Sequence, residues 1–143
     1  MTEAAHERGL ADTSVIISLE DIAPESLPAE LAISAVTLAE LTAGPHTTDD
    51  LPERARRQDR LQRVESTFDP LPFDEAAARA YGRLYAAVVT GGRKAHGARA
   101  MDLLIAATAV ANQLPLYTLN GADFRSLGDT LEVVEPVTRA GRP

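Results

Sequence analysis

The stretch LADTSVII, residues 10–17, places a single acid at the edge of an apolar helical face. If a helix starts here, Asp12 stands in line with Val15 and Ile16, at i, i+3 and i+4. An isolated buried carboxylate is costly unless it is paired or hydrogen-bonded. The position of Asp12 therefore needs a reason, and the simplest local reason is that Asp12 caps the helix.

Length and composition are those of one compact globular domain. The chain has 143 residues, of which 45% are apolar, so we expect a single domain over 1–143 with frayed ends at 1–8 and 137–143. The sequence has no cysteine, which excludes disulfides and thiolate catalysis. No apolar run is long enough to cross a membrane, and we expect a cytoplasmic protein.

The net charge of −7 argues against generic nucleic-acid binding, because phosphate contacts come from Lys and Arg. The excess of acids has two interpretations. It is either an ordinary solubilising surface, or a set of side chains gathered to hold a hard cation such as Mg²⁺ or Mn²⁺.

Short apolar segments alternate with helical patterns along the chain. We predict strands at 9–11, 31–34, 68–71, 116–119 and 131–134, and helices at 13–20, 36–43, 49–66, 75–90, 100–112 and 123–127. This alternation predicts a three-layer α/β/α domain with a short central parallel sheet. Active sites of such sheets lie at the carboxyl ends of the strands, where Asp12 is placed.

Three further acids stand in apolar surroundings. Asp102 is the only charge in AMDLLIAATAV, Glu40 lies one turn after Val36, and Asp123 follows a predicted strand in YTLNGADF. Each has a local alternative. Glu40 could close a capping box, Asp102 could meet a helix dipole, and Asp123 could cap a helix or follow an Asn-Gly hairpin.

Taken together, the four acids favour a metal site. Carboxylates that converge in one cleft repel each other and raise each other's pKa. A divalent cation neutralises the cluster and uses the oxygens as ligands. The inward carboxylate of Asp12 is then explained as a metal ligand.

The same residues resemble a known family. LADTSVI, the Glu40 of VTLAEL, the Asp102 of AMDLLIAA and the ending TLNGADF are similar to PIN-domain nucleases, specifically VapC-type toxins of bacterial toxin–antitoxin pairs. The resemblance covers residues 10 to 135 approximately. It implies a PIN-like fold in which Asp12, Glu40, Asp102 and Asp123 are the catalytic, metal-binding acids, with Asp12 and Asp102 as principal ligands.

The resemblance also implies a reaction and partners. It implies RNA cleavage with Mg²⁺ or Mn²⁺, which leaves a 5′-phosphate and a 3′-hydroxyl. It further implies a homodimer and inhibition by a cognate VapB-type antitoxin.

Polar residues around the acids are candidates for supporting roles. Hydroxyl and amide groups near the four acids could orient the ligands, or simply form turns and caps; they are Thr13, Ser14, Thr118 and Asn120. The basic cluster before Asp102 could hold the RNA backbone or form a solvated loop; its members are Arg93, Lys94 and Arg99.

Two other patterns favour structural explanations. Arg56, Arg60 and Arg63 share a face of the 49–66 helix, but acids interleave with them, so we predict a surface laced with ion pairs. Tyr81 and Tyr85 stand at helical spacing among Ala and Leu, which favours the core or a dimer interface.

Three other functions remain as alternatives. A receiver-type signalling module also gathers acids around Mg²⁺, but it needs a lysine at a strand end, and the single lysine, Lys94, lies in a Gly/Arg loop. A non-catalytic PIN-like binding partner would keep the acids for structure. A carboxylate-pair glycosidase is disfavoured, since the chain has no tryptophan and few aromatics.

Overall fold

The strands of the described chain form one parallel sheet. We analysed a computed structural model, which describes residues 6–90, 98–127 and 129–139. Its strands are β1 Arg8–Ala11, β2 Glu30–Ala32, β3 Leu116–Tyr117 and β4 Val133–Val134. Their order is β2-β1-β3-β4, and all neighbours are parallel. The central strand β1 therefore ends between two neighbours, directly before Asp12.

Helices connect these strands, as the sequence predicts. They are α1 Thr13–Ile17, α2 Ala35–Ala43, α3 Leu51–Thr67, α4 Glu75–Thr90 and α5 Ala98–Ala111. Short 3-10 turns lie at η1 Leu19–Asp21, η2 Pro24–Ser26, η3 Gly44–Thr47 and η4 Gly121–Leu127. The predicted helix 13–20 is thus split into α1 and η1, and the predicted helix 123–127 is the 3-10 turn η4.

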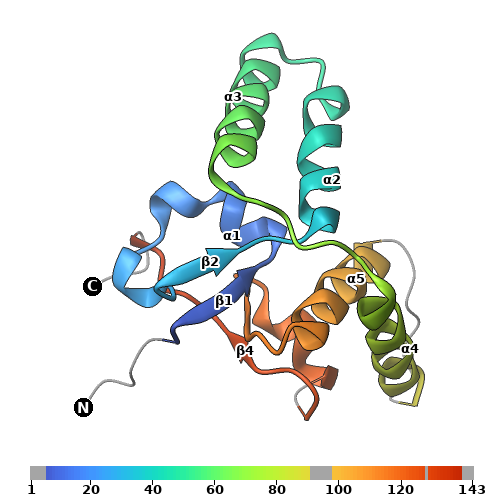
Figure 1. Ribbon diagram of the computed structural model, residues 1–143. Helices are drawn as coiled ribbons and strands as arrows, with labels where there is room; N and C mark the ends of the chain where they lie inside the picture. The colour runs from blue at the N-terminus through green and yellow to red at the C-terminus, as the bar shows by residue number, and fades with distance from the viewer. Residues whose placement is uncertain (1–5, 91–97, 128, 140–143) are drawn as a thin grey trace.

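Each face of the sheet has its own apolar core. Leu10 of β1 and Leu116 of β3 lie in a cluster with α4 and α5, which run side by side (Figure 1). Ala11 and Tyr117, the next residue on each strand, lie in a second cluster with α1 and α3. Successive side chains of a strand point to opposite faces, so the two clusters are the two sides of the sheet. The predicted three-layer arrangement is confirmed.

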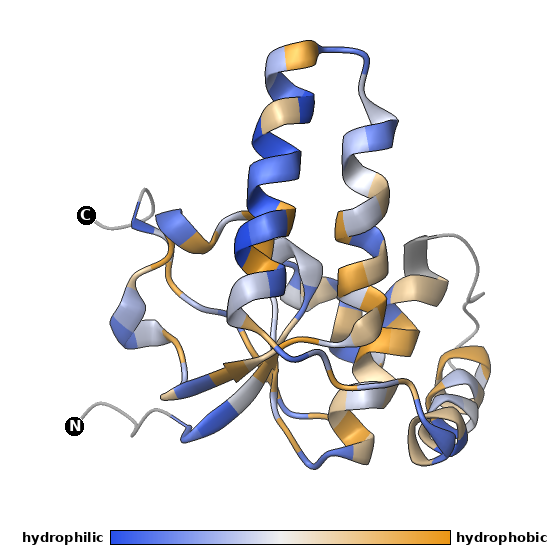
Figure 2. Ribbon diagram, turned by 45° about the horizontal axis from the view of Figure 1, so that its top comes forward, coloured by the Kyte–Doolittle hydropathy of each residue, from blue (hydrophilic) through white to orange (hydrophobic). Residues whose placement is uncertain are grey.

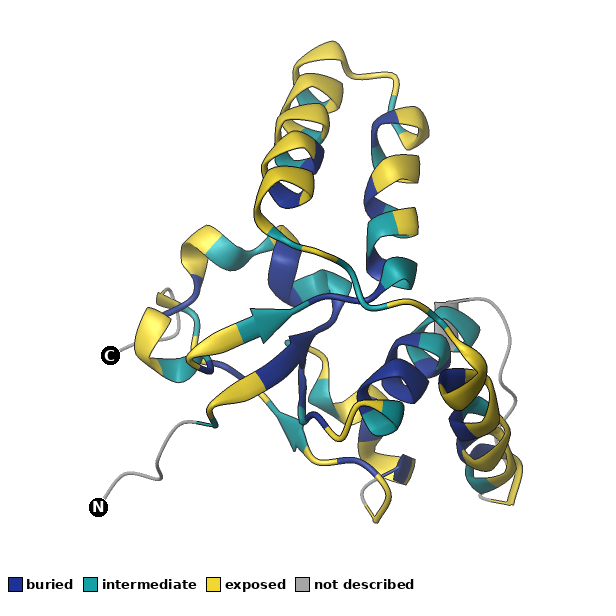
Figure 3. Cartoon of the chain, in the orientation of Figure 1, coloured by how far each residue is buried: buried dark blue, intermediate teal, exposed yellow. Residues whose placement is uncertain are grey.

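Helices α2 and α3 form a pair that projects away from the sheet (Figure 1). α3 is hydrophilic along most of its length (Figure 2), and its buried residues are Leu61 and Val64 (Figure 3). Arg57 of α3 donates hydrogen bonds to Gly44 O at 2.9 Å and to Thr47 Oγ1 at 2.8 Å. Polar contacts therefore fix the far end of the pair, and apolar contacts fix the end near the sheet.

The predicted strand at 68–71 is wrong. Only Leu71 pairs there, in an isolated parallel bridge with Ser34. Pro70 and Pro72 flank Leu71, and proline has no backbone N–H to donate to a strand ladder. The segment therefore runs beside the sheet without joining it.

Parts of both predicted frayed ends make contacts. His6 Nε2 lies 2.7 Å from Glu132 Oε2, and Arg8 already belongs to β1. Near the other end, Val137 N donates to Ser26 Oγ at 3.0 Å. Within the described residues, no helix combines the length and apolar character required to cross a bilayer.

Candidate active site

Asp12 caps α1 and is buried at the end of the central strand. Its Oδ1 accepts hydrogen bonds from Val15 N at 3.2 Å and from Ser14 Oγ at 2.6 Å, and the residue is only 3% exposed. Its Oδ2 makes no hydrogen bond with the described residues. In that same part of the chain no fully buried polar side-chain atom lacks a partner, so Oδ2 must reach solvent. Asp12 is therefore a helix cap that keeps one oxygen available.

Ser14 connects Asp12 to the chain that follows β3. Its Oγ donates to Asp12 Oδ1 and accepts from Leu119 N at 3.1 Å. Asp12 N also donates to Tyr117 O at 2.9 Å. The carboxylate is thus held from both its own helix and the neighbouring strand. The predicted role of Ser14 in orienting a metal ligand stays a prediction.

Glu40 is held by the residue that follows Asp12. Thr13 Oγ1 donates to Glu40 Oε1 at 2.5 Å, which is in the short range expected for a hydroxyl bonded to a carboxylate. The second oxygen, Oε2, makes no hydrogen bond with the described residues. A carboxylate from α2 is thereby fixed beside the end of β1.

A line of hydroxyls leads to this carboxylate. Thr37 Oγ1 lies 3.1 Å from Thr13 Oγ1, and Ser34 Oγ lies 3.4 Å from Thr37 Oγ1. Because a hydroxyl carries one proton and Thr13 gives its proton to Glu40, the Thr13–Thr37 contact must use the proton of Thr37. All donors then point toward Glu40, an order that stabilises its negative charge.

The capping-box interpretation of Glu40 is wrong. Ser34, not Thr37, is the N-cap of α2, since Thr37 N donates to Ser34 Oγ at 3.0 Å. Glu40 lies in the interior of α2 and does not cap it. Thr37 is fully buried. The sequence does not reveal the contact of its hydroxyl with Thr13, because a capping box also accounts for a threonine three residues before Glu40.

Asp102 and Asp123 come from two other elements. Asp102 lies in the second turn of α5 and is half-buried. Asp123 lies in η4, where its backbone N–H donates to Asn120 O at 2.9 Å, and its side chain is exposed. The hairpin alternative is wrong, because β3 and β4, which flank this segment, are parallel. The Asn120-Gly121 pair instead opens the 3-10 turn η4.

Thr118 and Asn120 shape the chain between β3 and η4. Thr118 is fully buried, and its Oγ1 accepts from Asn120 N at 3.0 Å. This hydrogen bond turns the chain toward Asp123. The turn-forming interpretation of both residues is supported, and their predicted action on the metal ligands stays a prediction.

The described residues do not bring three or more acids or histidines together as a ready metal cluster. Closely placed carboxylates repel each other when no cation lies between them. That all four acids come together around a metal ion thus stays a prediction.

The donor set of Asp12 and Glu40 nevertheless fits a hard cation. In each carboxylate, one oxygen is fixed by protein donors and the other has no hydrogen bond from the described residues. Such cations take oxygen ligands, and neighbouring donors that fix a ligand's orientation are typical of metal sites.

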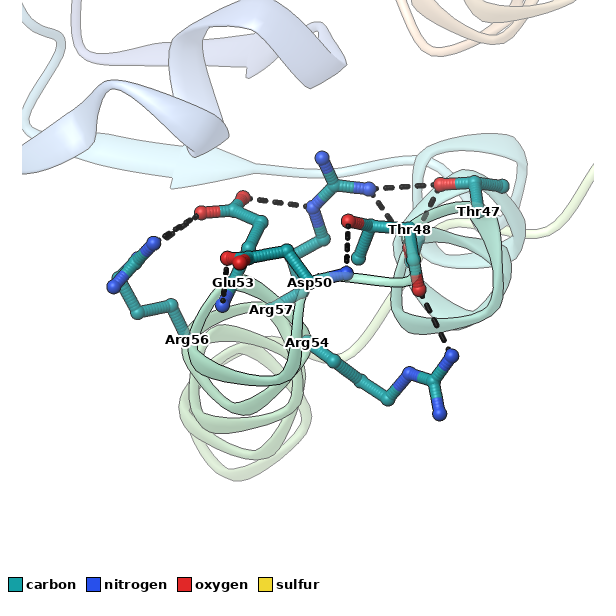
Figure 4. A network of polar contacts seen from close by, with 8 residues as sticks. Thr47, Thr48, Asp50, Glu53, Arg54, Arg56 and Arg57 are labelled. Atoms are coloured by element: carbon teal, nitrogen blue, oxygen red, sulfur yellow. Dashed lines mark hydrogen bonds and ion pairs between the residues drawn. The ribbon is translucent and has the colours of Figure 1, made fainter.

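A cavity of about 340 Å³ opens beside Glu40. We call it the Glu40 cavity; it is lined by Thr13, Ile17, Glu40, Leu41, Gly44, Thr47, Glu53, Arg57 and Arg60. Hydrogen bonds from Arg57 and Arg56 hold the pKa of the Glu53 carboxyl below its usual value (Figure 4). The cavity thus has a carboxylate end at Glu40 and a guanidinium end on α3.

The predicted RNA-contact residues are not part of the described structure. Arg93 and Lys94 lie outside the described residues. The backbone of Arg99 belongs to α5, but its side chain also lies outside them. Their contacts with RNA stay predictions.

Comparisons with known proteins agree with this architecture. The PIN domain matches residues 10–129, so the chain belongs to the PIN-domain family. Among curated relatives, Ribonuclease VapC5 of Mycobacterium tuberculosis is 35% identical over 128 residues, which cover 87% of this chain and 91% of that protein. Ribonuclease VapC of Rickettsia bellii is 33% identical over 133 residues, which cover 87% and 93%.

Solved structures show the same similarity. A VapBC-5 toxin–antitoxin structure from Mycobacterium tuberculosis matches with a TM-score of 0.78 and 34% identity, and covers 90% of this chain and 97% of that one. FitAcB from Neisseria gonorrhoeae matches with a TM-score of 0.66 and 26% identity, and covers 87% and 95%. The resemblance drawn from the four acidic motifs is confirmed.

Proposed function

We propose that the chain is a VapC-type toxin, an endoribonuclease that hydrolyses RNA phosphodiester bonds with a divalent metal ion. The observation that carries this proposal is the Thr13–Glu40 hydrogen bond, because it fixes an acid of α2 beside the end of β1, where Asp12 lies. The curated relatives named Ribonuclease VapC support the reaction.

Mg²⁺ or Mn²⁺ is the metal that the carboxylate oxygens favour. We propose Asp12 and Asp102 as principal ligands, with Glu40 completing the site or orienting the attacking water and Asp123 holding a second ion. A bound divalent cation supplies charge neutralisation of the phosphate and lowers the pKa of a bound water.

The chain's own residues prepare this chemistry. Ser14 and Val15 N hold Asp12 Oδ1, and Thr13 holds Glu40 Oε1, so that the remaining oxygens keep a fixed direction. Ligands fixed in this way need little rearrangement when the metal binds. Asp102 would approach from α5, on the other side of β1.

A VapB-type antitoxin is the proposed inhibitor. One of the similar solved structures is a VapBC toxin–antitoxin structure, which supports a partner of this type. We also propose a cytoplasmic homodimer. Exposed apolar residues of α4, Tyr85 and Val89, are available for such an interface.

Purified chain incubated with structured RNA tests the proposal. We expect discrete cuts with Mg²⁺ that disappear in EDTA and in Asp102→Asn, while the exposed loop variant Asp69→Asn cuts as the wild type does. Titration calorimetry with Mn²⁺ should show binding to the wild type and much weaker binding to Asp102→Asn.

The alternative is a non-catalytic PIN-like binding partner that keeps the four acids for structure. A folded, antitoxin-free chain that neither cuts RNA nor binds Mn²⁺ would favour that alternative and contradict the proposal.

A further inference from the structure

Helix α3 carries several arginines, and nearly all of them are occupied by protein partners. Arg54 Nη2 donates to Thr48 O at 2.8 Å, and Arg56 and Arg57 both bind Glu53 (Figure 4). Arg63 lies 3.8 Å from Glu20, both at the surface. Arg56, Arg57 and Arg63 thus form ion pairs, as the sequence predicts for this surface, and Arg54 binds a backbone oxygen.

Arg60 differs from its neighbours. It forms no ion pair or hydrogen bond with any described residue, although it is half-buried. An arginine side chain carries five N–H donors in a fixed fork that matches the oxygens of phosphate. A half-buried guanidinium whose donors have no protein partner is suited to an anion that comes from outside.

Arg60 stands at the boundary of two cavities. It lines the Glu40 cavity, and it also lines a cavity of about 250 Å³ between α1, η1 and α3. We call the second one the Ile16 cavity; it is lined by Ile16, Ile17, Leu19, Glu20, Arg60, Arg63, Val64, Thr67 and Phe68. Ile17 also lines both, so the two cavities meet at Arg60 and Ile17.

The two cavities differ in chemistry. The Glu40 cavity contains the proposed catalytic acid, whereas the Ile16 cavity is lined largely by aliphatic side chains and Phe68. A single RNA strand presents both kinds of surface, since its phosphates are anionic and its bases and ribose have apolar faces.

The negative charge of the chain favours such a contact. With a net charge of −7 and acids at the proposed site, the protein repels a polyanion unless cations lie close to the reacting phosphate. Arg57 points into the same cavity, but its charge is balanced by Glu53 at 2.8 Å. Arg60 is therefore the cation of α3 best placed to add attraction near Glu40.

We propose that Arg60 binds a backbone phosphate of the RNA substrate and guides the strand from the Glu40 cavity into the Ile16 cavity. This inference rests on the proposed ribonuclease function and names a substrate-binding residue for it. It also changes the sequence-based interpretation of Arg60 as part of a surface laced with ion pairs.

Binding and cleavage measured separately test this inference. Binding of a short fluorescent single-stranded RNA is followed by anisotropy in EDTA, at salt concentrations from about 50 to 200 mM. We expect Arg60→Ala to bind about tenfold more weakly, with a log–log salt slope smaller by about 0.7, the value for one phosphate contact on a single strand.

The matched variants are Arg60→Lys and Arg56→Ala. Arg60→Lys keeps the charge and should recover part of the affinity and most of the salt slope. Arg56→Ala removes an exposed arginine from the same helix and should bind as the wild type does. In cleavage, Arg60→Ala should raise KM about tenfold and change kcat less than about twofold.

The outcomes separate this inference from the proposed function. If the wild type cleaves RNA and Arg60→Ala binds and cleaves equally well, the inference fails and the function stands. If the wild type binds RNA through Arg60 but never cleaves it, the function fails and the phosphate contact stands. Equal losses in Arg60→Ala and Arg56→Ala, or no RNA binding by the wild type, overturn the inference.

Discussion

The hydroxyl of Thr13 donates a 2.5 Å hydrogen bond to the carboxylate of Glu40 and thereby connects the first turn of α1 to the interior of α2. Thr13 directly follows Asp12, whose own carboxylate is held by Ser14 and Val15. The two acids are thus fixed by adjacent parts of one short helix. Their orientation depends on α1, and variants of α1 can separate the contribution of each contact.

Thr13→Val removes the donor to Glu40 and keeps the size and β-branched shape of the side chain. Removing one partner leaves the half-buried Glu40 oxygen without its donor, and we expect a loss of about 1–2 kcal/mol in the free energy of unfolding. Mn²⁺ affinity should fall about tenfold or more, because the carboxylate loses its orienting contact. Urea denaturation and Mn²⁺ titration measure the two effects.

Thr42→Val is the control for this variant. Thr42 also lies on α2, but it is exposed and its hydroxyl only donates to Ala39 O of its own helix. Its Mn²⁺ affinity should equal that of the wild type. Unchanged Mn²⁺ affinity in Thr13→Val would show that the contact with Glu40 does not prepare a metal site.

Ser14→Ala should destabilise the chain at the junction of α1 and β3. The substitution removes a donor to Asp12 and the acceptor of Leu119 N, so two groups lose a partner at once. We expect a loss of about 1–3 kcal/mol in the free energy of unfolding, measured by urea denaturation. Ser18→Ala, where the hydroxyl makes no hydrogen bond with the described residues, should change stability by less than about 0.5 kcal/mol.

The fold follows closely from the sequence because its signals are local and periodic. Alternating apolar segments define the strands, and capping residues such as Asp74, which accepts from Ala77 N at 3.0 Å, define the helix starts. Where the prediction fails, a second local rule competes. Around Leu71 the apolar pattern favours a strand, but two flanking prolines remove the donors that a strand requires.

The sequence points to the acids of the candidate site and to the hydroxyls of Thr13 and Ser14 beside them, but not to Thr37 or Arg60. Asp12 and Glu40 stand out because a charge interrupts an apolar face, but the hydroxyl of Thr37 looks like an ordinary cap in the sequence. In the sequence, Arg60 shares a helix face with Arg56 and Arg63, which form ion pairs, so the pattern does not distinguish it from them. Its difference comes from tertiary structure, because it faces α1 across two cavities while Glu53 binds the arginines one turn earlier.

Stability in acid should depend on Glu53. Hydrogen bonds from Arg57 and then Arg56 lower its pKa in the folded chain. Because the pKa of Glu53 is lower in the folded chain than in the unfolded chain, its ionised form stabilises the fold. This stabilisation is fully present above the unfolded pKa and is lost as the pH falls through the folded pKa. Glu53→Gln should therefore flatten the acid side of the stability profile, measured by urea denaturation from neutral pH downward.

Glu65→Gln is the control for the acid profile. Glu65 is exposed on the same helix and has no ion pair with the described residues, so its removal should leave the acid side of the profile unchanged. If Glu53→Gln and the wild type lose stability in parallel as the pH falls, the guanidinium contacts of Figure 4 do not contribute to folding.

Asp12→Asn should separate the two roles of Asp12. Asparagine caps helices about as well as aspartate, so the N-cap of α1 is kept and the free energy of unfolding should change by less than about 1 kcal/mol. The variant loses the negative charge that a divalent cation needs, and it should bind Mn²⁺ much more weakly and stop cleaving RNA. Asp12→Ala loses both the charge and the cap, and should in addition lose about 1 kcal/mol of stability.

Asp50→Asn is the matched control, because Asp50 caps α3 in the same way, with Oδ2 accepting from Glu53 N at 3.0 Å, but lies away from Glu40 at the exposed end of the helix pair. It should keep both stability and cleavage. Full activity in Asp12→Asn would mean that the buried carboxylate serves only as a helix cap. Lost activity with the stability and the Asp50→Asn control both intact would assign the charge of Asp12 to the metal, since the cap and the fold are unchanged and only the ligand chemistry differs.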